Sequence, residues 1–279
     1  MTAADGYELR LERLLERLRS LGRVAVAFSG GVDSSALLHA ARSALGEGAV
    51  GVIADSPSLP RRELAEARAT AARIGAELAV IATDEMEDED YRANRGDRCY
   101  FCKSALFRAM EPWARAHGFR ALAFGEILDD FQDFRPGARA AREFGVVAPL
   151  SEAGFTKEDV RRYAREAGLG VADKPASACL ASRIPVGSRV TREGLARVER
   201  AEEFVRSLGF RQLRVRDHGV LARVEVAEDE LAPARERLEE IRDGLLAQGY
   251  TAVVLAAYLP PSRRGIVPVK DAMGVQPAS

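Results

Sequence analysis

The chain has 279 residues, of which 47% are hydrophobic and 30% are charged, and its formal net charge at pH 7 is -1. This length predicts one large domain or two of ordinary size. The balanced charge argues against a broad nucleic-acid-binding surface, and the sequence has no apolar run long enough to span a membrane. The first twenty residues mix acidic and basic side chains and do not resemble a signal peptide, so we expect a cytoplasmic protein with reduced thiols.

The first half of the chain alternates predicted helices and strands. The opening residues predict a polar amphipathic helix, and further helices are predicted after Gly31, at 60–75 and at 103–118. Apolar runs predict buried strands at 24–28, 49–56, 77–84 and 120–127. This alternation predicts an α/β fold with a doubly wound, mainly parallel sheet.

The connecting segments have their own signals. The acidic run 84–91 is interpreted as a solvated loop, and 128–144 as a polar loop that leads into a short helix. Residues 156–170 predict a capped helix with a glycine stop. The segment 171–191 is rich in Pro and Ser without periodicity, so we interpret it as a loop that carries function.

The order of predicted elements changes near residue 191 to helix, strand, strand, helix, strand, and the second of these helices covers 228–249. This order is typical of a small α+β domain. We therefore predict a larger domain at 1–188, which carries the cysteine motifs, and a smaller C-terminal domain at 189–279 for substrate binding and oligomerisation. The last residues, from 259 onward, predict a loosely held tail.

The segment F-S-G-G-V-D-S-S, residues 28–35, lies between a predicted strand and a predicted helix. Backbone N–H groups at a helix N-terminus attract anions, so this loop predicts a phosphate site. Its candidate ligands are Ser29, Gly30, Gly31, Ser34 and Ser35. Asp33 would repel a polyphosphate unless a cation stood between them, which implies Mg²⁺. The simpler alternative is a strand-to-helix turn with a serine cap.

S-G-G-V-D-S resembles the signature of the PP-loop, or N-type, ATP pyrophosphatases. The resemblance implies an adenine nucleotide alpha-hydrolase-like fold that cleaves ATP between the α and β phosphates and adenylylates a carboxylate or carbonyl oxygen. It also implies that Asp55 and Ser56 lie near the adenosine and that Gly125 and Glu126 pass beside the nucleotide.

The chain has three cysteines, Cys99 and Cys102 in a C-x-x-C pair and Cys179 in the Pro/Ser-rich loop. A zinc site would need a fourth ligand, and no histidine stands beside a cysteine. Three thiolates suit a [4Fe-4S] cluster with one iron open to another ligand. Buried apolar cysteines and a redox-active pair remain as alternatives.

Taken together, the motifs make the chain similar to the LarE family of ATP-dependent sulfurtransferases. They are S-G-G-V-D-S-S, R-C-Y-F-C-K, G-E-I-L-D-D with D-F-R-P-G, K-P-A-S-A-C-L-A-S-R-I-P and L-R-V-R-D-H-G. The resemblance implies conversion of the two carboxylates of pyridinium-3,5-biscarboxylic acid mononucleotide to thiocarboxylates, on the route to the nickel-pincer nucleotide.

The resemblance implies two ways to supply the sulfur. In one, the cysteine at the position of Cys179 gives up its own sulfur and becomes dehydroalanine. In the other, three cysteines hold a [4Fe-4S] cluster whose open iron binds sulfide from solution or from a sulfur donor. Because all three are present, we favour the cluster with Cys99, Cys102 and Cys179 as ligands, and Cys179 and Asp33 as catalytic residues.

Arg214 and Arg216 are two residues apart on a predicted strand, so both side chains lie on one face and suit a phosphate. The phosphate of the mononucleotide implied by the resemblance is the natural ligand. Arg183 could bind the same anion or AMP, and Glu202 is a candidate metal ligand. The simpler interpretation is a solvated arginine face.

Other functions use parts of the same sequence. A tRNA thiolase of the PP-loop superfamily is disfavoured by the near-neutral charge. An amide-forming synthetase would leave the cysteines without a role, and a nucleotide-sensing module would release no AMP or pyrophosphate. The family resemblance also implies a homo-oligomer, namely a hexamer.

Overall fold

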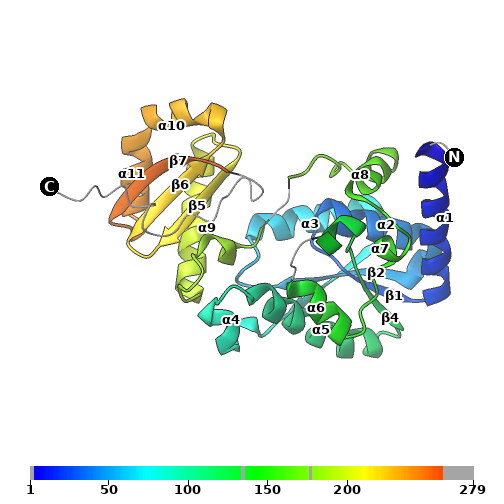
Figure 1. Cartoon of the computed structure of the whole chain (residues 1–279). Helices are drawn as coiled ribbons and strands as arrows, with labels where there is room; N and C mark the ends of the chain where they lie inside the picture. The colour runs from blue at the N-terminus through cyan, green and yellow to red at the C-terminus, as the bar shows by residue number, and fades with distance from the viewer. Residues whose placement is uncertain (1–2, 133–135, 176–177, 260–279) are drawn as a thin grey trace. The chain divides into compact units, whose positions relative to one another are not determined.

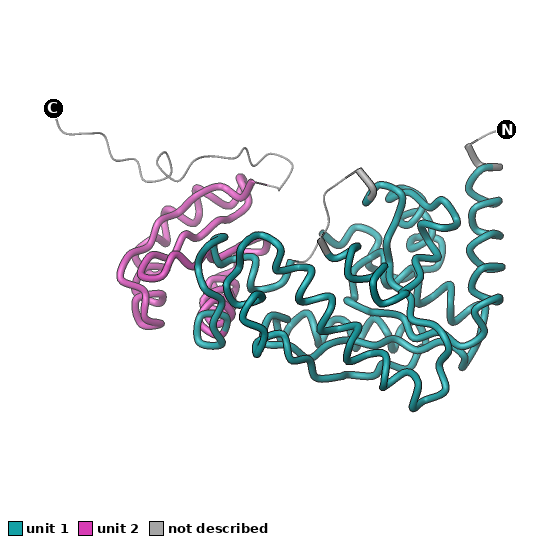
Figure 2. Tube along the Cα trace, turned by 60° about the horizontal axis from the view of Figure 1, so that its bottom comes forward, with its two compact units in different colours: residues 1–195 teal, residues 196–279 magenta. Residues whose placement is uncertain are grey.

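The computed structural model describes residues 3–132, 136–175 and 178–259, and the chain divides into two compact units, Met1–Leu195 and Ala196–Ser279 (Figure 2). Within those ranges, no helix has both the length and the apolar character needed to cross a membrane. The predicted tail, beyond Leu259, lies outside the described residues, as do residues 133–135 of the D-F-R-P-G motif. The functions assigned to 1–188 and 189–279 stay predictions.

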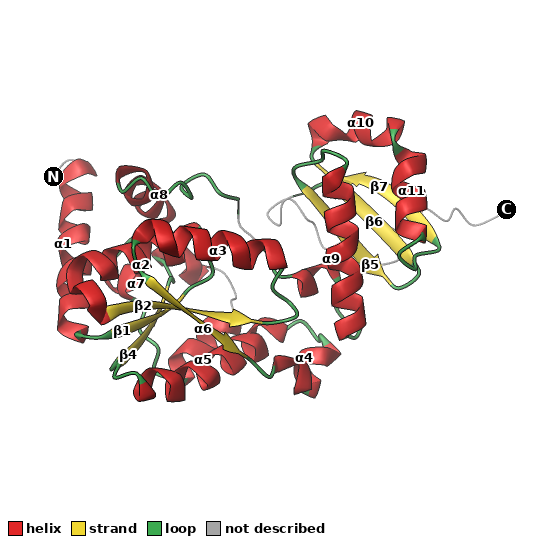
Figure 3. Ribbon diagram, turned by 180° about the vertical axis from the view of Figure 1, so that it is seen from behind, coloured by secondary structure: helices red, strands yellow, loops and turns green. Residues whose placement is uncertain are grey.

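The first unit is built on a four-stranded sheet in which every neighbouring pair is parallel (Figures 1 and 3). The order is β3-β2-β1-β4, with bounds β1 Val24–Ala27, β2 Ala49–Asp55, β3 Glu77–Ala82 and β4 Ala121–Phe124. The winding direction reverses between β1 and β4, because β4 joins the sheet on the other side of β1. Open α/β sheets bind ligands at such a switch point.

Helices cover both faces of this sheet (Figure 3). One face packs against α1 Ala3–Leu21, α2 Val32–Leu45, α3 Arg61–Ile74, α7 Pro149–Glu152 and α8 Lys157–Glu166. The other packs against α5 Arg98–Ala116 and α6 Pro136–Glu143. In β1, Val24 and Val26 join the first core while Ala25 and Ala27 join the second. This arrangement confirms the predicted doubly wound α/β fold.

The helix predicted at 156–170 is confirmed as α8. Thr156 is its N-cap and accepts a hydrogen bond from the Asp159 backbone, while the Asp159 carboxylate accepts from Thr156, which completes a capping box. After the helix, Gly168 takes a φ of 65°, a left-handed conformation that suits glycine. The sequence signals and the structure agree at both ends.

The interpretation of 84–91 as a solvated loop is wrong. A 3₁₀ turn at Glu85–Glu87 leads into α4 Glu89–Ala93, whose N-cap Asp88 accepts hydrogen bonds from the backbone of residues 90 and 91. Glu85 and Tyr91 are each only 1% exposed. Ser56 donates a hydrogen bond to one oxygen of the buried Glu85 carboxylate, and the other oxygen has no partner among the described residues.

The second unit contains a three-stranded mixed sheet in the order β5-β6-β7. Its strands are β5 Leu213–His218, β6 Leu221–Val226 and β7 Ala252–Ala257, and its helices are α9 Arg192–Ser207, which begins in the first unit, α10 Leu231–Glu236 and α11 Leu238–Leu246. β5 pairs antiparallel and β7 parallel with β6. The separate small sheet confirms the predicted α+β character of this part.

The single helix predicted at 228–249 is wrong, because α10 and α11 are separate. Pro233 lies in the first turn of α10, which starts at Leu231, and proline is tolerated there because the N–H groups of the first turn have no partner within the helix. The chain leaves helical geometry at Arg237, whose φ and ψ are -103° and 17°. Its guanidinium donates to the carbonyl of Leu208 and pairs with Glu240.

Candidate functional site

A cavity of about 140 Å³ lies at the carboxyl ends of β1 and β4, at the switch point of the sheet. Its lining comes from β1, the loop into α2, the helix α5 and the end of β4: Ala27, Phe28, Ser29, Gly31, Asp33, Ser34, Lys103, Leu106, Phe124 and Gly125. The predicted phosphate loop therefore borders a cavity in the position where this fold class binds ligands.

The serine hydroxyls of the loop bond to one another. Ser29 Oγ and Ser34 Oγ are 3.1 Å apart, and Ser34 Oγ also accepts from the Ser29 N–H at 3.2 Å. These hydroxyls can rotate toward a ligand, because none is engaged by a charged group in the described contacts. Ser35 differs: it is fully buried, and its Oγ has no partner among the described residues.

Glycine is required at Gly30 and Gly125 for different reasons. Gly30 has a φ of 70°, and a Cβ there would lie 3.0 Å from the Cα of Ala67 on α3. At Gly125 a Cβ would lie 2.9 Å from the backbone nitrogen of Ser34. Gly31 is less restricted, since its Cβ would meet only Ser29 Oγ, at 3.4 Å. The loop is thus shaped by close approach of α3 and β4.

Asp33 lies in the first turn of α2 and forms an ion pair with Lys157, the first residue of α8. The Lys157 ammonium donates to both carboxylate oxygens, at 2.7 and 2.8 Å. Both side chains stay partly exposed, so a ligand can reach them. Sequence analysis missed Lys157, although it directly follows the N-cap Thr156 at a recognised helix start.

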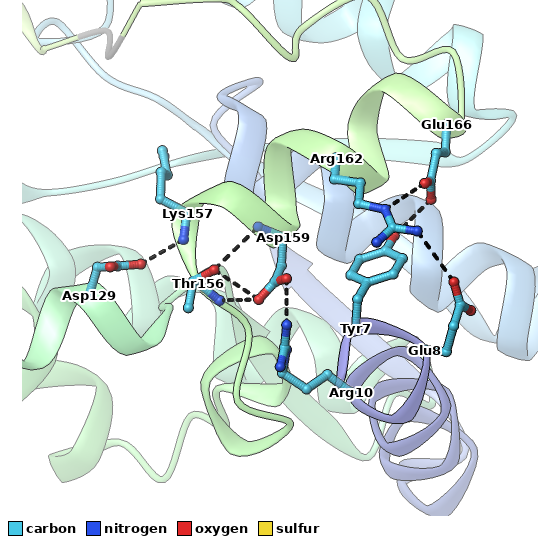
Figure 4. A network of polar contacts seen from close by, with 9 residues as sticks. All are labelled: Tyr7, Glu8, Arg10, Asp129, Thr156, Lys157, Asp159, Arg162 and Glu166. Atoms are coloured by element: carbon cyan, nitrogen blue, oxygen red, sulfur yellow. Dashed lines mark hydrogen bonds and ion pairs between the residues drawn. The ribbon is translucent and has the colours of Figure 1, made fainter. Parts of the chain in front are cut away.

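The N-terminus of α8 is fixed by a polar network (Figure 4). The Lys157 backbone N–H donates to Asp129, and Arg10 from α1 donates to Asp159 at 2.7 Å. Burial alone would raise the pKa of Asp159, but hydrogen bonds from Arg10 and Thr156 outweigh it and lower the pKa. These hydrogen bonds fix the backbone of Lys157 and therefore the point from which its side chain extends.

Lys103 is a second cation that sequence analysis missed, although it follows Cys102 directly in R-C-Y-F-C-K. It lines the cavity, and its ammonium lies 5.7 Å from the ring of Phe107 and 5.9 Å from that of Phe124. Burial lowers its pKa, while the Cys102 and Cys99 thiols and Glu126 act in the opposite direction. Lys103 therefore connects the cavity with the cysteine pair.

The residues predicted to lie near the adenosine or beside the nucleotide differ in their exposure and in their partners. Asp55, at the end of β2, pairs with Arg61 and is exposed. Ser56 is buried, donates to Glu85 and accepts from the Ser58 N–H at 3.0 Å. Glu126 follows β4 and influences the pKa of Lys103. Their contacts with a nucleotide stay predictions.

Cys99 and Cys102 lie in the first turn of α5, which begins at Arg98 and not at Lys103 as the sequence predicted. Burial and then the Cys179 thiol raise the pKa of Cys102 to about 12, and the same two causes raise that of Cys99. The charge of Cys179 thus raises the pKa of both thiols of the pair, so the three cysteines lie close enough to interact electrostatically.

Among the described residues, no three His, Cys, Asp or Glu side chains are arranged to hold a single metal ion. A cluster makes a different demand, because each thiolate binds a different iron and the sulfurs stand further apart. The donor set, three thiols with no histidine, suits iron-sulfur chemistry more than any single hard cation.

The segment around Cys179 is held at several points. Upstream, Lys174 pairs with Glu63 and Glu66 of α3. Immediately downstream, the Leu180 N–H donates to the Ser58 carbonyl at 2.8 Å. Arg183 is only 3% exposed, and its guanidinium donates to the carbonyls of Ala178 and Cys179. Its predicted role in phosphate or AMP binding stays a prediction beside this loop-shaping role.

In the second unit, Arg214 and Arg216 share the face of β5 opposite the buried Leu213 and Val215. Arg216 pairs with Glu225 on β6, Nε to Oε2 3.0 Å, and Arg223 lies beside them, opposite Arg216 in the register. The sequence missed Arg223 and Glu225, which only the strand register brings to this face.

Glu202, the candidate metal ligand, is 4% exposed, and its carboxylate accepts from the Val215 N–H at 3.1 Å. This contact fixes α9 to β5. The metal role of Glu202 stays a prediction.

Comparisons with known proteins give matches over most of the chain. An uncharacterized protein of Synechocystis is 41% identical over 243 residues, which cover 87% of this chain and 90% of that protein. The pyridinium-3,5-bisthiocarboxylic acid mononucleotide synthase of Lactiplantibacillus plantarum is 35% identical over 243 residues, 87% of this chain and 88% of the synthase. No family model matches the chain.

A more distant match covers about half of the chain. Argininosuccinate synthase of Haloarcula marismortui is 33% identical over 161 residues, which span 54% of this chain and 38% of the synthase. Such synthases are ATP-using members of the PP-loop superfamily, so the match supports ATP binding by this chain.

Proposed function

The chain belongs to the LarE family of PP-loop sulfurtransferases, and from that membership we propose that it converts carboxylates of pyridinium-3,5-biscarboxylic acid mononucleotide to thiocarboxylates in nickel-pincer nucleotide biosynthesis. One observation carries this proposal. Lys103 lines the cavity of the phosphate loop and directly follows Cys102 in α5, and the charge of Cys179 raises the pKa of both Cys99 and Cys102. These observations support a site for ATP beside a site for sulfur, the combination that an ATP-dependent sulfurtransferase requires.

The first step is adenylylation. A carboxylate oxygen of the substrate attacks the α-phosphorus of ATP, the bond to the oxygen that bridges to the β-phosphorus breaks, and pyrophosphate leaves with the electron pair. The N–H groups in the first turn of α2 would bind the phosphates, and Lys103 and Lys157 would add positive charge. The leaving pyrophosphate carries the negative charge that these groups stabilise.

Magnesium belongs to this step by the chemistry of Asp33. Its carboxylate is the hard oxygen ligand that Mg²⁺ prefers, and it stands at the edge of the cavity. Lys157 donates to both oxygens of Asp33, so a metal ion bound there would use the remaining lone pairs of the carboxylate or displace the ammonium.

The second step is sulfur transfer. A sulfide sulfur attacks the carbonyl carbon of the acyl adenylate, the bond from that carbon to the phosphate oxygen breaks, and AMP leaves. A [4Fe-4S] cluster on Cys99, Cys102 and Cys179 would supply an iron that binds the sulfide before transfer. In the sacrificial alternative, Cys179 Sγ attacks instead, and elimination from that residue leaves dehydroalanine.

The substrate phosphate would bind Arg214 and Arg216, and Arg183 is a separate candidate for binding the phosphate or AMP. Two guanidinium groups on one strand face suit a phosphate because each can donate two parallel hydrogen bonds. We further propose a cytoplasmic homo-oligomer, a hexamer by family resemblance, with Glu202 as a metal ligand and sulfide or a sulfur donor as the sulfur source.

The deciding experiment starts from protein purified without oxygen, in which iron and labile sulfide are measured. We then add ATP, Mg²⁺, the pyridinium mononucleotide and sulfide, and follow AMP, pyrophosphate and thiocarboxylate. About four irons per chain with repeated turnover support the cluster version. Little iron, one turnover and loss of a sulfur from Cys179 support the sacrificial version.

Two outcomes contradict the proposal. If the pyridinium substrate elicits no AMP or pyrophosphate, the reaction is wrong, and if tRNA elicits them instead, the chain is a tRNA thiolase. Cys99→Ser and Cys102→Ser separate the two sulfur routes: each abolishes turnover in the cluster version and leaves one turnover per subunit when Cys179 is the donor.

A further inference from the structure

Asn94 has an unusual conformation for its residue type. It follows α4, precedes the helix that carries Cys99 and Cys102, and is fully buried. Its φ is 53°, which makes it the one non-glycine residue with positive φ in the part of the chain that the structure describes. Asn tolerates this left-handed conformation better than most residues, because its side chain can bond locally.

The Asn94 side chain binds the segment that follows Cys179. Its Nδ2 lies 2.8 Å from the carbonyl oxygen of Pro185, 3.0 Å from that of Ser188 and 3.4 Å from that of Ile184. The Asn94 carbonyl in turn accepts from the Gly187 N–H at 2.9 Å. One residue therefore holds a complete turn of the 184–188 segment.

The same side chain also binds the helix of the cysteine pair. Asn94 Oδ1 accepts a hydrogen bond from Arg98 Nη1 at 2.5 Å, and Arg98 is the first residue of α5. Cys99 is its direct neighbour in sequence. Donor and acceptor ends of one amide thus join two segments that lie about 90 residues apart in the chain.

The second attachment of the Cys179 segment is independent of Asn94. The Leu180 N–H donates to Ser58, next to Cys179, whereas Asn94 holds the far end of the same segment. Lys174 holds the segment upstream of Cys179, and the Val190 N–H, which donates to the Arg92 carbonyl, holds it further downstream. The Asn94 side chain differs from these contacts because it also binds Arg98, the first residue of α5, so its loss removes a direct link between the 184–188 segment and the helix of the cysteine pair.

We propose that Asn94 is a positioning residue that holds Cys179 within reach of Cys99 and Cys102, so that the three thiols can act as one sulfur site. This inference rests on the proposed function, which makes those thiols the sulfur-handling groups. Asparagine suits the position because its amide offers two N–H donors to the carbonyls and, on a separate atom, an oxygen acceptor to arginine. Aspartate would place a carboxylate against three carbonyl oxygens.

The test is cross-linking of the reduced, iron-free full chain with dibromobimane, a short reagent that joins two nearby thiols, and peptide mass spectrometry identifies each linked pair. The variant is Asn94→Gly, which keeps the left-handed backbone and removes the side chain. We expect cross-links from Cys179 to the α5 pair to fall about tenfold, because the effective concentration of Cys179 drops. The link between Cys99 and Cys102 should have the same yield in the variant as in the wild type, because the raised pKa of Cys102 slows its alkylation in both chains.

Arg95→Met is the matched control, because Arg95 is the next residue, is exposed and pairs only with Asp90 among the described contacts. It should cross-link like the wild type. Thermal unfolding and pyrophosphate binding of each variant show whether the first unit is intact. Arg98→Met removes the other partner of the amide and should give an intermediate loss.

The outcomes separate the two proposals. An Asn94→Gly chain that is folded and links Cys179 with wild-type yield overturns the positioning role and leaves the sulfurtransferase proposal standing. A wild-type chain that links as expected but takes up no iron after anaerobic reconstitution contradicts the cluster and leaves the role of Asn94 intact. Absence of any wild-type link to Cys179 overturns the inference.

Discussion

The ammonium of Lys157 lies 2.7 and 2.8 Å from the two carboxylate oxygens of Asp33, although the residues are 124 positions apart in the chain. Asp33 is therefore neutralised by a protein cation before any metal arrives. We expect that, when phosphates enter the cavity beside Asp33, the same ammonium exchanges a carboxylate oxygen for a phosphate oxygen.

Lys157→Met should weaken binding of ATP and pyrophosphate by about 10- to 100-fold, the range for loss of a hydrogen bond to a charged group. AMP should bind nearly as in the wild type, since it lacks the β and γ phosphates. Isothermal titration with each ligand measures this, and Lys157→Arg should recover part of the loss. Arg161→Met removes an exposed charge one turn later on α8 and is the control. Unchanged pyrophosphate affinity would contradict the prediction.

Thr156→Ala removes the N-cap of α8 and should lower the free energy of unfolding by about 1 kcal/mol. The loss should depend on pH through Asp159, whose pKa is lowered in the folded chain. A lowered pKa adds stability that is complete above the unfolded value, about 3.9, and is lost as pH falls through the folded value. Urea unfolding at pH 7 and at about pH 3 should therefore show a smaller difference between variant and wild type in acid.

Gly125→Ala should disturb the phosphate loop from the β4 side. The added Cβ would lie 2.9 Å from the Ser34 backbone nitrogen and 3.0 Å from the Asp33 carbonyl carbon, and neither backbone atom can move without shifting α2. We expect a loss of about 1 to 3 kcal/mol in unfolding free energy, as for other overpacked sites. Gly31→Ala is the matched comparison, because its Cβ makes only an ordinary contact, and equal losses would argue against the steric explanation.

Cys102 should resist alkylation in the reduced, iron-free chain. Burial and the Cys179 thiol raise its pKa to about 12, so the thiol stays protonated at pH values where an ordinary cysteine, pKa about 8.5, is half ionised. Iodoacetamide at pH 8.5 should modify it about 100-fold or more slowly than in the unfolded chain. Cys179→Ser should speed the reaction by lowering that pKa, although burial keeps it above the usual value. If the alkylation rate of Cys102 in the wild type depended on pH as that of a free cysteine does, this account would be wrong.

Local sequence signals predicted the fold well. Strand alternation, the glycine-rich turn and the capping residues Thr156 and Asp159 all act within a few positions of one another, so each could be recognised without tertiary information. The interpretation of the acidic run 84–91 as a solvated loop was wrong because it depended on a residue distant in sequence. Glu85 is buried because Ser56, 29 residues earlier, donates to it, and composition alone cannot reveal such a partner.

The candidate site was predictable only in part. Glycines, Asp33 and the cysteines stand in recognisable spacings, whereas Lys157 and Asn94 act on residues that only the folded chain brings close. One signal was present in the composition: only four of the 41 Lys and Arg residues are lysines. Two of the four, Lys103 and Lys157, lie at the cavity or bind Asp33 at its edge. The presence of lysine in a chain that otherwise uses arginine was therefore a signal for these positions.

The contact between Gly30 and Ala67 extends the reach of the phosphate loop into α3. A left-handed glycine sits against the Cα of Ala67, so the shape of the anion cradle depends on a small residue one helix away. By its position, a larger residue at 67 would be classed as a substitution in the hydrophobic core. We nevertheless expect it to weaken nucleotide binding, so in an activity assay it would be mistaken for a catalytic mutant.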